Sequence, residues 1–575
     1  MPHFHLDLRA THQHLVQVHL RHRPKLPVLR LSLPSWTPGS YLIRDYVRQL
    51  EGLEIAQGGT SLDVIRTGTS TWQVELPDLS SVDLRYRLVA PELTVRTCHL
   101  TSDHGFLALA AVVLLIEGER WSRHTISLDL PEGWKGFVPL PPSAEGWCAN
   151  DFDALIDAPI EAGPHQEHAF SVAGVPHRWV VWGRDLMGRD LAADPQWLVD
   201  VERVCLACCR LIGEERPAAD SYLFVLHLTA DGYGGLEHDN STVLQFGRRA
   251  LAKPDGRRKL LQLVAHEYLH QWNVRRLRPA ELTPYDYGQA VVVPTLWFAE
   301  GITSYVDQLL PHAAGITSQA SVLEDLGADL SRYRLTPGRA VQSLKASGEE
   351  AWVKLYKSDA HSFNNQISYY LKGAVLALVL DLHLRRHGAC LPQVLQALWQ
   401  SHGRWGRGYG EADLLACFAS FCPELRNLLP VWLQSCCDPP LEEYLVDVGL
   451  KLVPELASHC DLGATFEAPM ASASDLRVQR IQRDGPACAA GLMVGDELVA
   501  IDQQRVRSTD DLTALLSPDW ANQEHCLLVC RDQQLRELLV TPAPVAIKAW
   551  SLQSDPDATD HQLQVRQRWL ALQVP

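Results

Sequence analysis

The chain has 575 residues and a formal charge of −16 at neutral pH, from 68 acidic and 52 basic side chains. This length is long for one hydrophobic core and predicts about three or four domains. An apolar content of 46% and a charged content of 21% are typical of globular proteins and exclude large-scale disorder. The excess negative charge repels polyanions, so nucleic acid is a poor candidate partner.

The sequence carries no signal for a membrane or for export. Its longest apolar run, FLALAAVVLLI at residues 106–116, is far shorter than the ~20 residues of a membrane helix and predicts a buried strand. The first residues alternate polar and apolar side chains, unlike a signal peptide. We therefore expect a cytoplasmic protein with no membrane partner. Cys205 and Cys208 have CxxC spacing but lie in a helical pattern without a second ligand pair, which favours buried thiols over a metal site.

The chain divides by pattern into five parts. Short alternating runs separated by Gly, Pro, Asp and Ser predict an all-β domain over residues 1–173. Residues 174–320 combine a helix near Trp197, an apolar strand at 222–228 and two helices at about 259–273 and 296–310. Residues 321–455 are mostly helical, short strands return over 456–545, and 546–575 form a polar tail suited to docking. The predicted fold class is multidomain α+β.

The pentapeptide HEYLH carries the first indication of chemistry. On a helix, His266 and His270 share one face and can point two imidazoles at one ion. Glu267 lies beside such a site and not on it. Composition alone produces this pattern in roughly one chain in twenty of this size, so a third ligand is needed.

Glu300 is the candidate third ligand, in the sequence WFAEG on the following predicted helix. A carboxylate buried among aromatic residues is costly unless it is paired, and coordination to Zn²⁺ relieves that cost. The alternative is a solvent-facing glutamate on an amphipathic helix. Two histidines and one glutamate leave a fourth position open for water, which is typical of catalytic zinc. Glu267 can then serve as general base in amide hydrolysis.

Five stretches in order resemble the glycyl aminopeptidase family, metallopeptidase family sixty-one, a gluzincin group related to thermolysin and to the aminopeptidase N enzymes. They are PSWTPGSYLIRDYVRQL (34–50), YGGLEHDNST (233–242), HEYLHQWNVRRLRP (266–279), WFAEGITSYVD (297–307) and SYYLKG (368–373). The resemblance implies a thermolysin-like catalytic domain over 174–320, completed by the helical domain. It also implies one Zn²⁺ per chain, held by His266, His270 and Glu300, with Glu267 as general base.

The resemblance further implies that Glu237, in YGGLEH, binds the free α-ammonium group of a peptide. The residues agree with this role, because Gly234 and Gly235 follow a strand and let a peptide lie along its edge. The alternative is a β-turn with a solvated Glu237. Tyr370, in the YxKG register, resembles the tyrosine that donates to the oxyanion, although core packing fits either Tyr370 or Tyr369.

Near the metal motif, the group that orients a ligand histidine is undecided, and the other charged residues are expected to be structural. The thermolysin-like pattern places an acidic residue one helical turn after the glutamate ligand, where this chain has Ser304. Whether Asp307 or another carboxylate orients a ligand histidine is therefore open. The three arginines after the motif are expected to form structural ion pairs, and His238 is expected to be packed beside the site. These arginines are Arg275, Arg276 and Arg278.

Residues 461–542 resemble a bacterial-type PDZ domain, with LGATF as its carboxylate-binding loop. Such a domain binds a peptide C-terminus along a sheet edge, so a peptide is a candidate partner there, and packing on the catalytic body is the equal alternative. The sequence thus predicts a zinc aminopeptidase that removes small N-terminal residues, glycine or alanine by resemblance. The alternatives are a zinc endopeptidase and a non-catalytic PDZ scaffold with a relic metal site.

Overall fold

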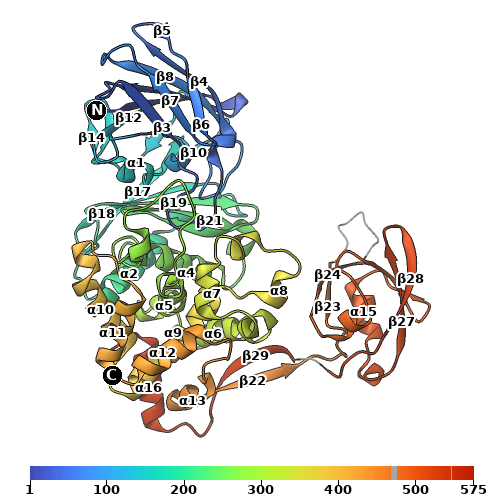
Figure 1. Ribbon diagram of the computed structural model, residues 1–575. Coiled ribbons are helices and arrows are strands. Elements are labelled where there is room, and N and C mark those ends of the chain that lie inside the picture. Colours follow the sequence, from blue (N-terminus) through green and yellow to red (C-terminus); the bar gives the residue numbers. More distant parts are fainter. Residues whose placement is uncertain (468–475, 546) are drawn as a thin grey trace. The chain divides into compact units, whose positions relative to one another are not determined.

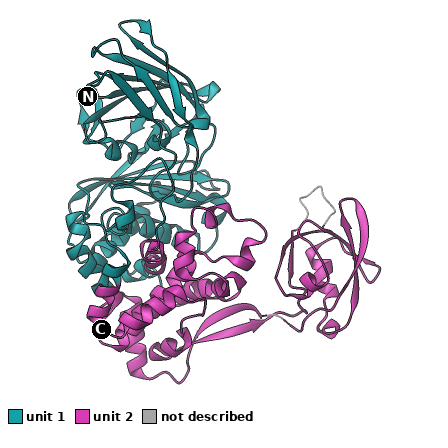
Figure 2. Ribbon diagram, in the orientation of Figure 1, with its two compact units in different colours: residues 1–293, 309–317, 392–414 teal, residues 294–308, 318–391, 415–575 magenta. Residues whose placement is uncertain are grey.

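The computed structural model describes residues 1–467, 476–545 and 547–575, with elements labelled in Figure 1. It contains two compact units (Figure 2). Unit 1 comprises residues 1–293, 309–317 and 392–414, and unit 2 comprises 294–308, 318–391 and 415–575. The described residues confirm the predicted multidomain α+β class.

The N-terminal part of unit 1 is all-β, as the alternation in the sequence predicts. Its largest sheet has eight strands in the order β14-β15-β12-β1-β2-β8-β4-β5. These strands are β1 (His3–Ala10), β2 (Leu15–His22), β4 (Leu50–Gln57), β5 (Thr60–Ser61), β8 (Val82–Val89), β12 (His124–Asp129), β14 (Pro142–Ser143) and β15 (Gly146–Ala149). In β8 every second side chain is buried, so one face of the sheet packs on the core.

Two four-stranded sheets complete this part, with the orders β13-β16-β10-β9 and β11-β3-β7-β6. Their strands are β3 (Val28–Ser32), β6 (Ile65–Gly68), β7 (Thr71–Glu75), β9 (His99–Leu100), β10 (Gly105–Leu107), β11 (Leu115–Ile116), β13 (Lys135–Phe137) and β16 (Ile160–Gly163). The apolar run 106–116 is largely buried, as predicted. Only its ends are strands, because the 3-10 turn η3 (Leu109–Ala111) separates β10 from β11.

A five-stranded sheet of unit 1 positions the predicted metal motif. Its five strands run in the order β17-β18-β19-β21-β20. They are β17 (Glu167–Val172), β18 (Val175–Trp182), β19 (Tyr222–Thr229), β20 (Tyr233–Glu237) and β21 (Ser241–Gly247). The apolar β19 is parallel to β18 and β21, whereas β20 is antiparallel to β21 and forms the edge. Helices α2 (Pro195–Ile212) and α4 (Gly256–Leu269) pack together, and α4 also contacts β20.

Helix α2 contains the CxxC pair. Its N-cap is Asp194, and it ends at Gly213, which has a left-handed φ of 77° suited to glycine. Cys205 and Cys208 face the interior as buried thiols that form no disulfide, which agrees with the prediction for this pair.

Unit 2 is mostly helical and is built around the buried helix α9. Its helices are α6 (Gln319–Arg334), α7 (Leu344–Glu349), α8 (Ser362–Asn365), α9 (Tyr369–Arg386), α12 (Leu425–Gln434) and α13 (Leu441–Leu445). A π-helical turn, η6 (Trp297–Gly301), leads into α5 (Ile302–Ala313) and packs against α9. The approach is close enough that a Cβ on Gly301 would lie 2.5 Å from the Cα of Gly373. Both positions therefore require glycine.

One segment of the described residues, 362–386, is long and apolar enough to cross a membrane by length and composition. Of its most apolar window, 89% is buried inside the molecule, as the core helix of a folded unit would be.

The PDZ-like part of unit 2 is an insertion between two paired strands. Strand β22 (Leu450–Leu456) is antiparallel to β29 (Ile547–Ser554), and Leu456 pairs with Ile547. Between them lies a sheet in the order β23-β24-β25-β27-β28, with β26 beside β25. Its elements are β23 (Ala464–Glu467), β24 (Leu476–Ile481), α14 (Pro486–Ala489), β25 (Glu497–Ile501), β26 (Gln504–Arg505), α15 (Thr509–Leu515), β27 (His525–Arg531) and β28 (Gln534–Val540). This part has its own buried apolar core.

The C-terminal tail packs back on the helical part of unit 2. Helix α16 (Asp560–Leu570) buries Trp569 completely, and the indole Nε1 donates to Tyr305 Oη at 2.6 Å. Strand β29 is also fixed, because the Trp550 backbone N–H donates to Ser331 Oγ on α6. The tail therefore docks, and it contributes a strand that the sequence pattern did not reveal.

Candidate active site

Helix α4 presents the two predicted metal-binding histidines. His266 and His270 are one helical turn apart, and their ring centroids are 4.7 Å apart with the rings nearly perpendicular. His266 is half-buried, and His270 is 1% exposed at the C-cap, where the helix ends. Two imidazoles on one helix face are thus held close together.

The turn after α4 fixes the orientation of His270. Its Nδ1 lies 2.5 Å from the backbone oxygen of Asn273, so Nδ1–H donates and Nε2 keeps its lone pair. This arrangement, with the outer nitrogen bonded to an oxygen, is usual for histidines that bind metal. The sequence left the orienting group open among carboxylates, and for His270 it is a main-chain carbonyl, which no side-chain pattern could indicate.

Glu267 is buried against strand β20. A Cβ added to Gly235 would lie 2.2 Å from Glu267 Oε1, so this carboxylate occupies the space left by the missing side chain. The Gly235 carbonyl accepts a hydrogen bond from the Arg96 guanidinium at 3.0 Å. Gly234 is different: nothing lies within 4 Å of its Cβ position, and its φ is +156°. Of the two predicted glycines, one accommodates Glu267 and the other borders open space.

Glu237 ends the same edge strand and is 4% exposed. Carboxylate oxygens of Glu237 and Glu267 and a ring nitrogen of His270 lie within 4.8 Å of one another. Among the described residues Glu237 Oε1 is buried without a hydrogen-bond partner. The alternative of a solvated glutamate in a β-turn is therefore wrong, since Glu237 lies in a strand and is buried.

The N-terminal motif PSWTPGSY contacts this carboxylate. A Cβ on Gly39 would lie 2.5 and 2.6 Å from the two Glu237 oxygens, and Gly39 has a left-handed φ of +79°. Nearby, the Arg44 guanidinium donates to Ser40 Oγ, which stabilises the turn. Two of the five quoted stretches thus meet at Glu237.

Arg275, the first of the three arginines after the metal motif, forms ion pairs, as expected. Arg275 lies 2.9 Å from Asp157 and 2.7 Å from Asp239. Burial lowers the pKa of Arg275, but attraction to the two carboxylates is stronger and holds it well above its usual value. His238 contacts Asp157 at 3.0 Å, which agrees with its expected packed role. Arg278 stacks over the ring of Tyr285 at 4.2 Å.

Unit 2 carries the other predicted site residues. Glu300, on η6, is 1% exposed, so the alternative of a solvent-facing glutamate is wrong. On α9, Tyr369 is fully buried whereas Tyr370 is half-buried, and their rings stack at 4.7 Å. Tyr370 Oη lies 3.2 Å from Tyr356 Oη, and Tyr369 Oη lies 3.4 Å from the same oxygen. Tyr369 thus has the core environment.

The donor set of unit 1 suits zinc. Two neighbouring imidazoles, one with its Nδ1 hydrogen-bonded to a backbone oxygen, are ligands that Zn²⁺ prefers. The buried carboxylates of Glu237 and Glu267 add negative charge beside them, which favours a cation.

Comparisons with known proteins agree with these observations. Residues 3–164 match the profile of the peptidase M61 N-terminal domain, 259–376 that of the M61 glycyl aminopeptidase domain, and 460–541 that of a PDZ domain. No curated protein matches the chain. A solved aminopeptidase N family protein from Idiomarina loihiensis is 28% identical, covers 99% of this chain and 100% of its own, and has a TM-score of 0.92.

More distant structures also match. An M1 zinc metallopeptidase from Deinococcus radiodurans is 14% identical over 76% of this chain and 94% of its own, with a TM-score of 0.48. Yeast LTA4 hydrolase is 14% identical over 76% of this chain and 68% of its own, with a TM-score of 0.45. From the profiles and the first structure, the chain carries the N-terminal domain and the glycyl aminopeptidase domain of the M61 peptidases, together with a PDZ domain.

Proposed function

We propose that the protein removes small N-terminal residues, glycine or alanine, from peptides, with one catalytic zinc held by His266, His270 and Glu300. The perpendicular imidazole pair, the fixed tautomer of His270 and the burial of Glu300 support this ligand set. Bound there, zinc supplies Lewis-acid polarisation of the scissile carbonyl and a water of lowered pKa. The preference for glycine or alanine rests on the family alone.

Glu267 is the proposed general base. Its carboxylate is buried and seated over Gly235, next to His270. From that place it would take a proton from the attacking water and pass it to the leaving amine. The close fit against β20 restricts the carboxylate to few positions, which suits proton transfer over a short distance.

Glu237 carries the assignment as an aminopeptidase. It is a buried carboxylate at the end of an edge strand, and one of its oxygens has no partner among the described residues. An α-ammonium group would satisfy that oxygen, and such a charge-assisted contact contributes about 1.5 to 3 kcal/mol. The open space beside Gly234 on the same strand leaves room for the first residue of a peptide. Tyr370 is the proposed donor to the developing oxyanion.

The deciding experiment compares free and blocked amino ends. Glycyl, alanyl and leucyl anilides are assayed with and without an N-acetyl group, for wild type and for Glu237→Ala. We expect wild type to prefer free amines, and the variant to lose about 10- to 200-fold on them, which corresponds to the contact energy above. Activity on N-acetyl substrates should be nearly unchanged. Glu281→Ala, at an exposed glutamate, is the matched control.

The same panel separates the alternatives. Equal losses on free and N-acetylated substrates would refute the amine-binding role and favour an endopeptidase. Glu267→Gln should retain zinc, measured by metal analysis, while hydrolysis stops. If wild type binds zinc but cleaves no substrate, the scaffold hypothesis is favoured.

A further inference from the structure

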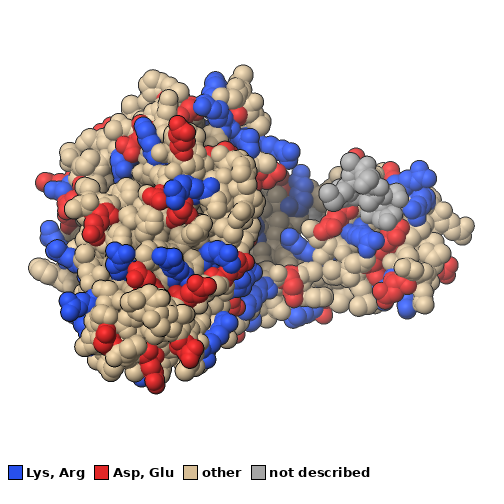
Figure 3. Space-filling view, turned by 90° about the horizontal axis from the view of Figure 1, so that it is seen from above, with Lys and Arg blue, Asp and Glu red and all other residues tan. Residues whose placement is uncertain are grey.

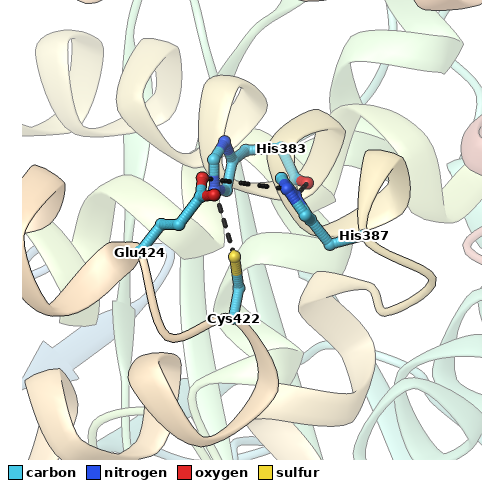
Figure 4. A group of neighbouring side chains, drawn as sticks. All are labelled: His383, His387, Cys422 and Glu424. Carbon is cyan, nitrogen blue, oxygen red and sulfur yellow. Dashed lines mark hydrogen bonds and ion pairs between the residues drawn. The ribbon is translucent and has the colours of Figure 1, made fainter.

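A second group of metal-ligating side chains lies in unit 2 and includes none of the residues proposed for catalysis (Figure 4). His383 is on the last turns of α9, and His387 follows as its C-cap. Cys422 and Glu424 come from the short connection between α11 (Glu411–Phe421) and α12. One ligand atom from each of the four lies within 4.8 Å of the others.

The separations within this group fit a tetrahedral ion. His383 Nε2 is 3.3 Å from Cys422 Sγ, and His387 Nε2 is 3.8 Å from Glu424 Oε2. Around Zn²⁺, with bonds of about 2.0 to 2.3 Å, tetrahedral ligand atoms lie roughly 3.3 to 3.8 Å apart. The two measured separations fall within that range, and the other separations within the group are at most 4.8 Å.

Both imidazoles are oriented with Nε2 toward the centre of the group. His387 Nδ1 donates to the backbone oxygen of His383 at 2.9 Å. His383 Nδ1 lies 2.9 Å from Tyr444 Oη, which can accept its proton. In each case the outer nitrogen is engaged by an oxygen and the inner nitrogen faces a sulfur or a carboxylate, the usual arrangement for histidine ligands of metals.

For two of the four residues, His383 and Cys422, a hydrogen bond within the core is a simpler explanation of their proximity. His383 is 2% exposed and Cys422 is 1% exposed, so a thiol–imidazole hydrogen bond would satisfy both. His387 and Glu424, on the partly exposed side, form an ion pair that faces the same point, so all four ligand atoms converge there. Two buried and two accessible ligands describe a site with an entry path from solvent.

We propose that His383, His387, Cys422 and Glu424 bind a second, structural zinc ion. Imidazole and thiolate ligands select zinc over magnesium or calcium, and four protein ligands leave no position for substrate. On binding, the Cys422 thiol releases its proton to solvent and its sulfur forms a bond to zinc, with no change in oxidation state. The ion would tie the end of α9, whose first turn carries Tyr370, to the α11–α12 connection.

Cobalt replacement gives a test that is independent of activity. The proposed catalytic ligands include no cysteine, so a thiolate-to-cobalt charge-transfer band in the near ultraviolet reports on this group alone. We expect the full-length protein loaded with Co²⁺ to show the band, and a His266→Ala/His270→Ala variant to retain it. His387→Ala and Cys422→Ser should abolish it. Failure of the proposed catalytic site would leave the band unchanged, so the two proposals fail separately.

Zinc content supplies the second measurement. We expect two zinc ions per wild-type chain and one in His387→Ala or Glu424→Gln, both at partly or fully exposed side chains whose replacement spares the core. The controls Cys437→Ser and His361→Ala, at exposed positions in unit 2, should keep two. The proposal is overturned if the wild type shows no cobalt–thiolate band, or if the band persists in both Cys422→Ser and His387→Ala.

Discussion

Gly235 is a residue whose side chain must be absent for Glu267 to keep its place. A methyl group there would lie 2.2 Å from the carboxylate, and Glu267 is 5% exposed with little room to retreat. We expect Gly235→Ala to fold and to bind zinc but to lose about 10²-fold in turnover, because a displacement of about 1 Å costs that much in a positioned catalytic group. Steady-state kinetics with metal analysis measures both quantities.

The control for this change is Gly410→Ala, where the nearest atom to the added methyl is 3.8 Å away, in Asp413. Its kinetics should match wild type. Equal turnover in Gly235→Ala would show that the position of Glu267 against β20 is not needed for the reaction.

His177 gives the stability of unit 1 a defined dependence on pH. Its Nδ1 donates to the Val175 carbonyl, its Nε2 contacts Tyr268 Oη, and burial lowers its pKa to about 4. An unfolded chain binds this proton below about pH 6.5, whereas the native state does so only near pH 4. Stability is therefore full above pH 6.5 and falls as pH drops toward 4, by about 3 kcal/mol for this group.

Urea unfolding at several pH values tests this expectation. His177→Gln should show a smaller loss of unfolding free energy between pH 6.5 and 4 than wild type, by up to ~1.4 kcal/mol per pH unit. His12→Gln, at an exposed position, should follow the wild-type slope. A His177→Gln slope equal to wild type would mean that the buried imidazole is protonated in the native state.

At the scale of elements, the side chain of Trp569 helps to fix α16 on the helical part of unit 2. Trp569 is fully buried and donates to Tyr305 Oη, which in turn donates to Asp381 on α9 at 2.9 Å. Trp569→Ala should lower the free energy of unfolding by about 3 to 5 kcal/mol, since it creates a large cavity. Leu563→Ala, on the exposed side of the same helix, should change it by less than about 0.5 kcal/mol.

Local periodicity explains which elements the sequence could predict. The four-residue spacing of His266 and His270 places both on one face of any helix, so their proximity follows from the sequence. The hydrogen bond from His270 to the Asn273 carbonyl does not follow from the sequence, because it depends on how the backbone turns after His270. Likewise β22 and β29 pair across nearly a hundred residues. Such pairing depends on register and on the intervening domain, neither of which a short pattern carries.

The burial of side chains at the candidate site could likewise not be predicted from the sequence. The sequence alone does not decide whether the side chains of Glu237 and Glu300 are buried or solvated, because it does not show in which direction a glutamate side chain points. The structure buries both, and it adds Gly39 and Arg96 to the surroundings of the YGGLE strand. The quoted PSWTPGSY stretch was the available signal for Gly39. No pattern singled out Arg96.

At the scale of the whole molecule, the chain enters and leaves the PDZ domain at two residues that lie side by side. Leu456 and Ile547 are paired across β22 and β29, so a short glycine-containing turn could replace residues 457–546. We expect this shortened chain to fold and to cleave a glycyl anilide with little change. It would lose the two bonds between the Asn364 side chain and the backbone of Ile481 and Arg483, about 1 kcal/mol each. Loss of anilide turnover would instead tie catalysis to the PDZ domain.

The contact between Gly39 and Glu237 joins segments almost two hundred positions apart in the chain. A bulkier residue in the first segment would push on the Glu237 carboxylate, which is proposed to bind the amino end of a peptide. The N-terminal β part therefore borders the proposed amine-binding carboxylate, and grafting it from a relative would succeed only where the donor loop also has glycine at this point. Under this proposal, selection on substrate choice can act on a domain that contributes no reacting group.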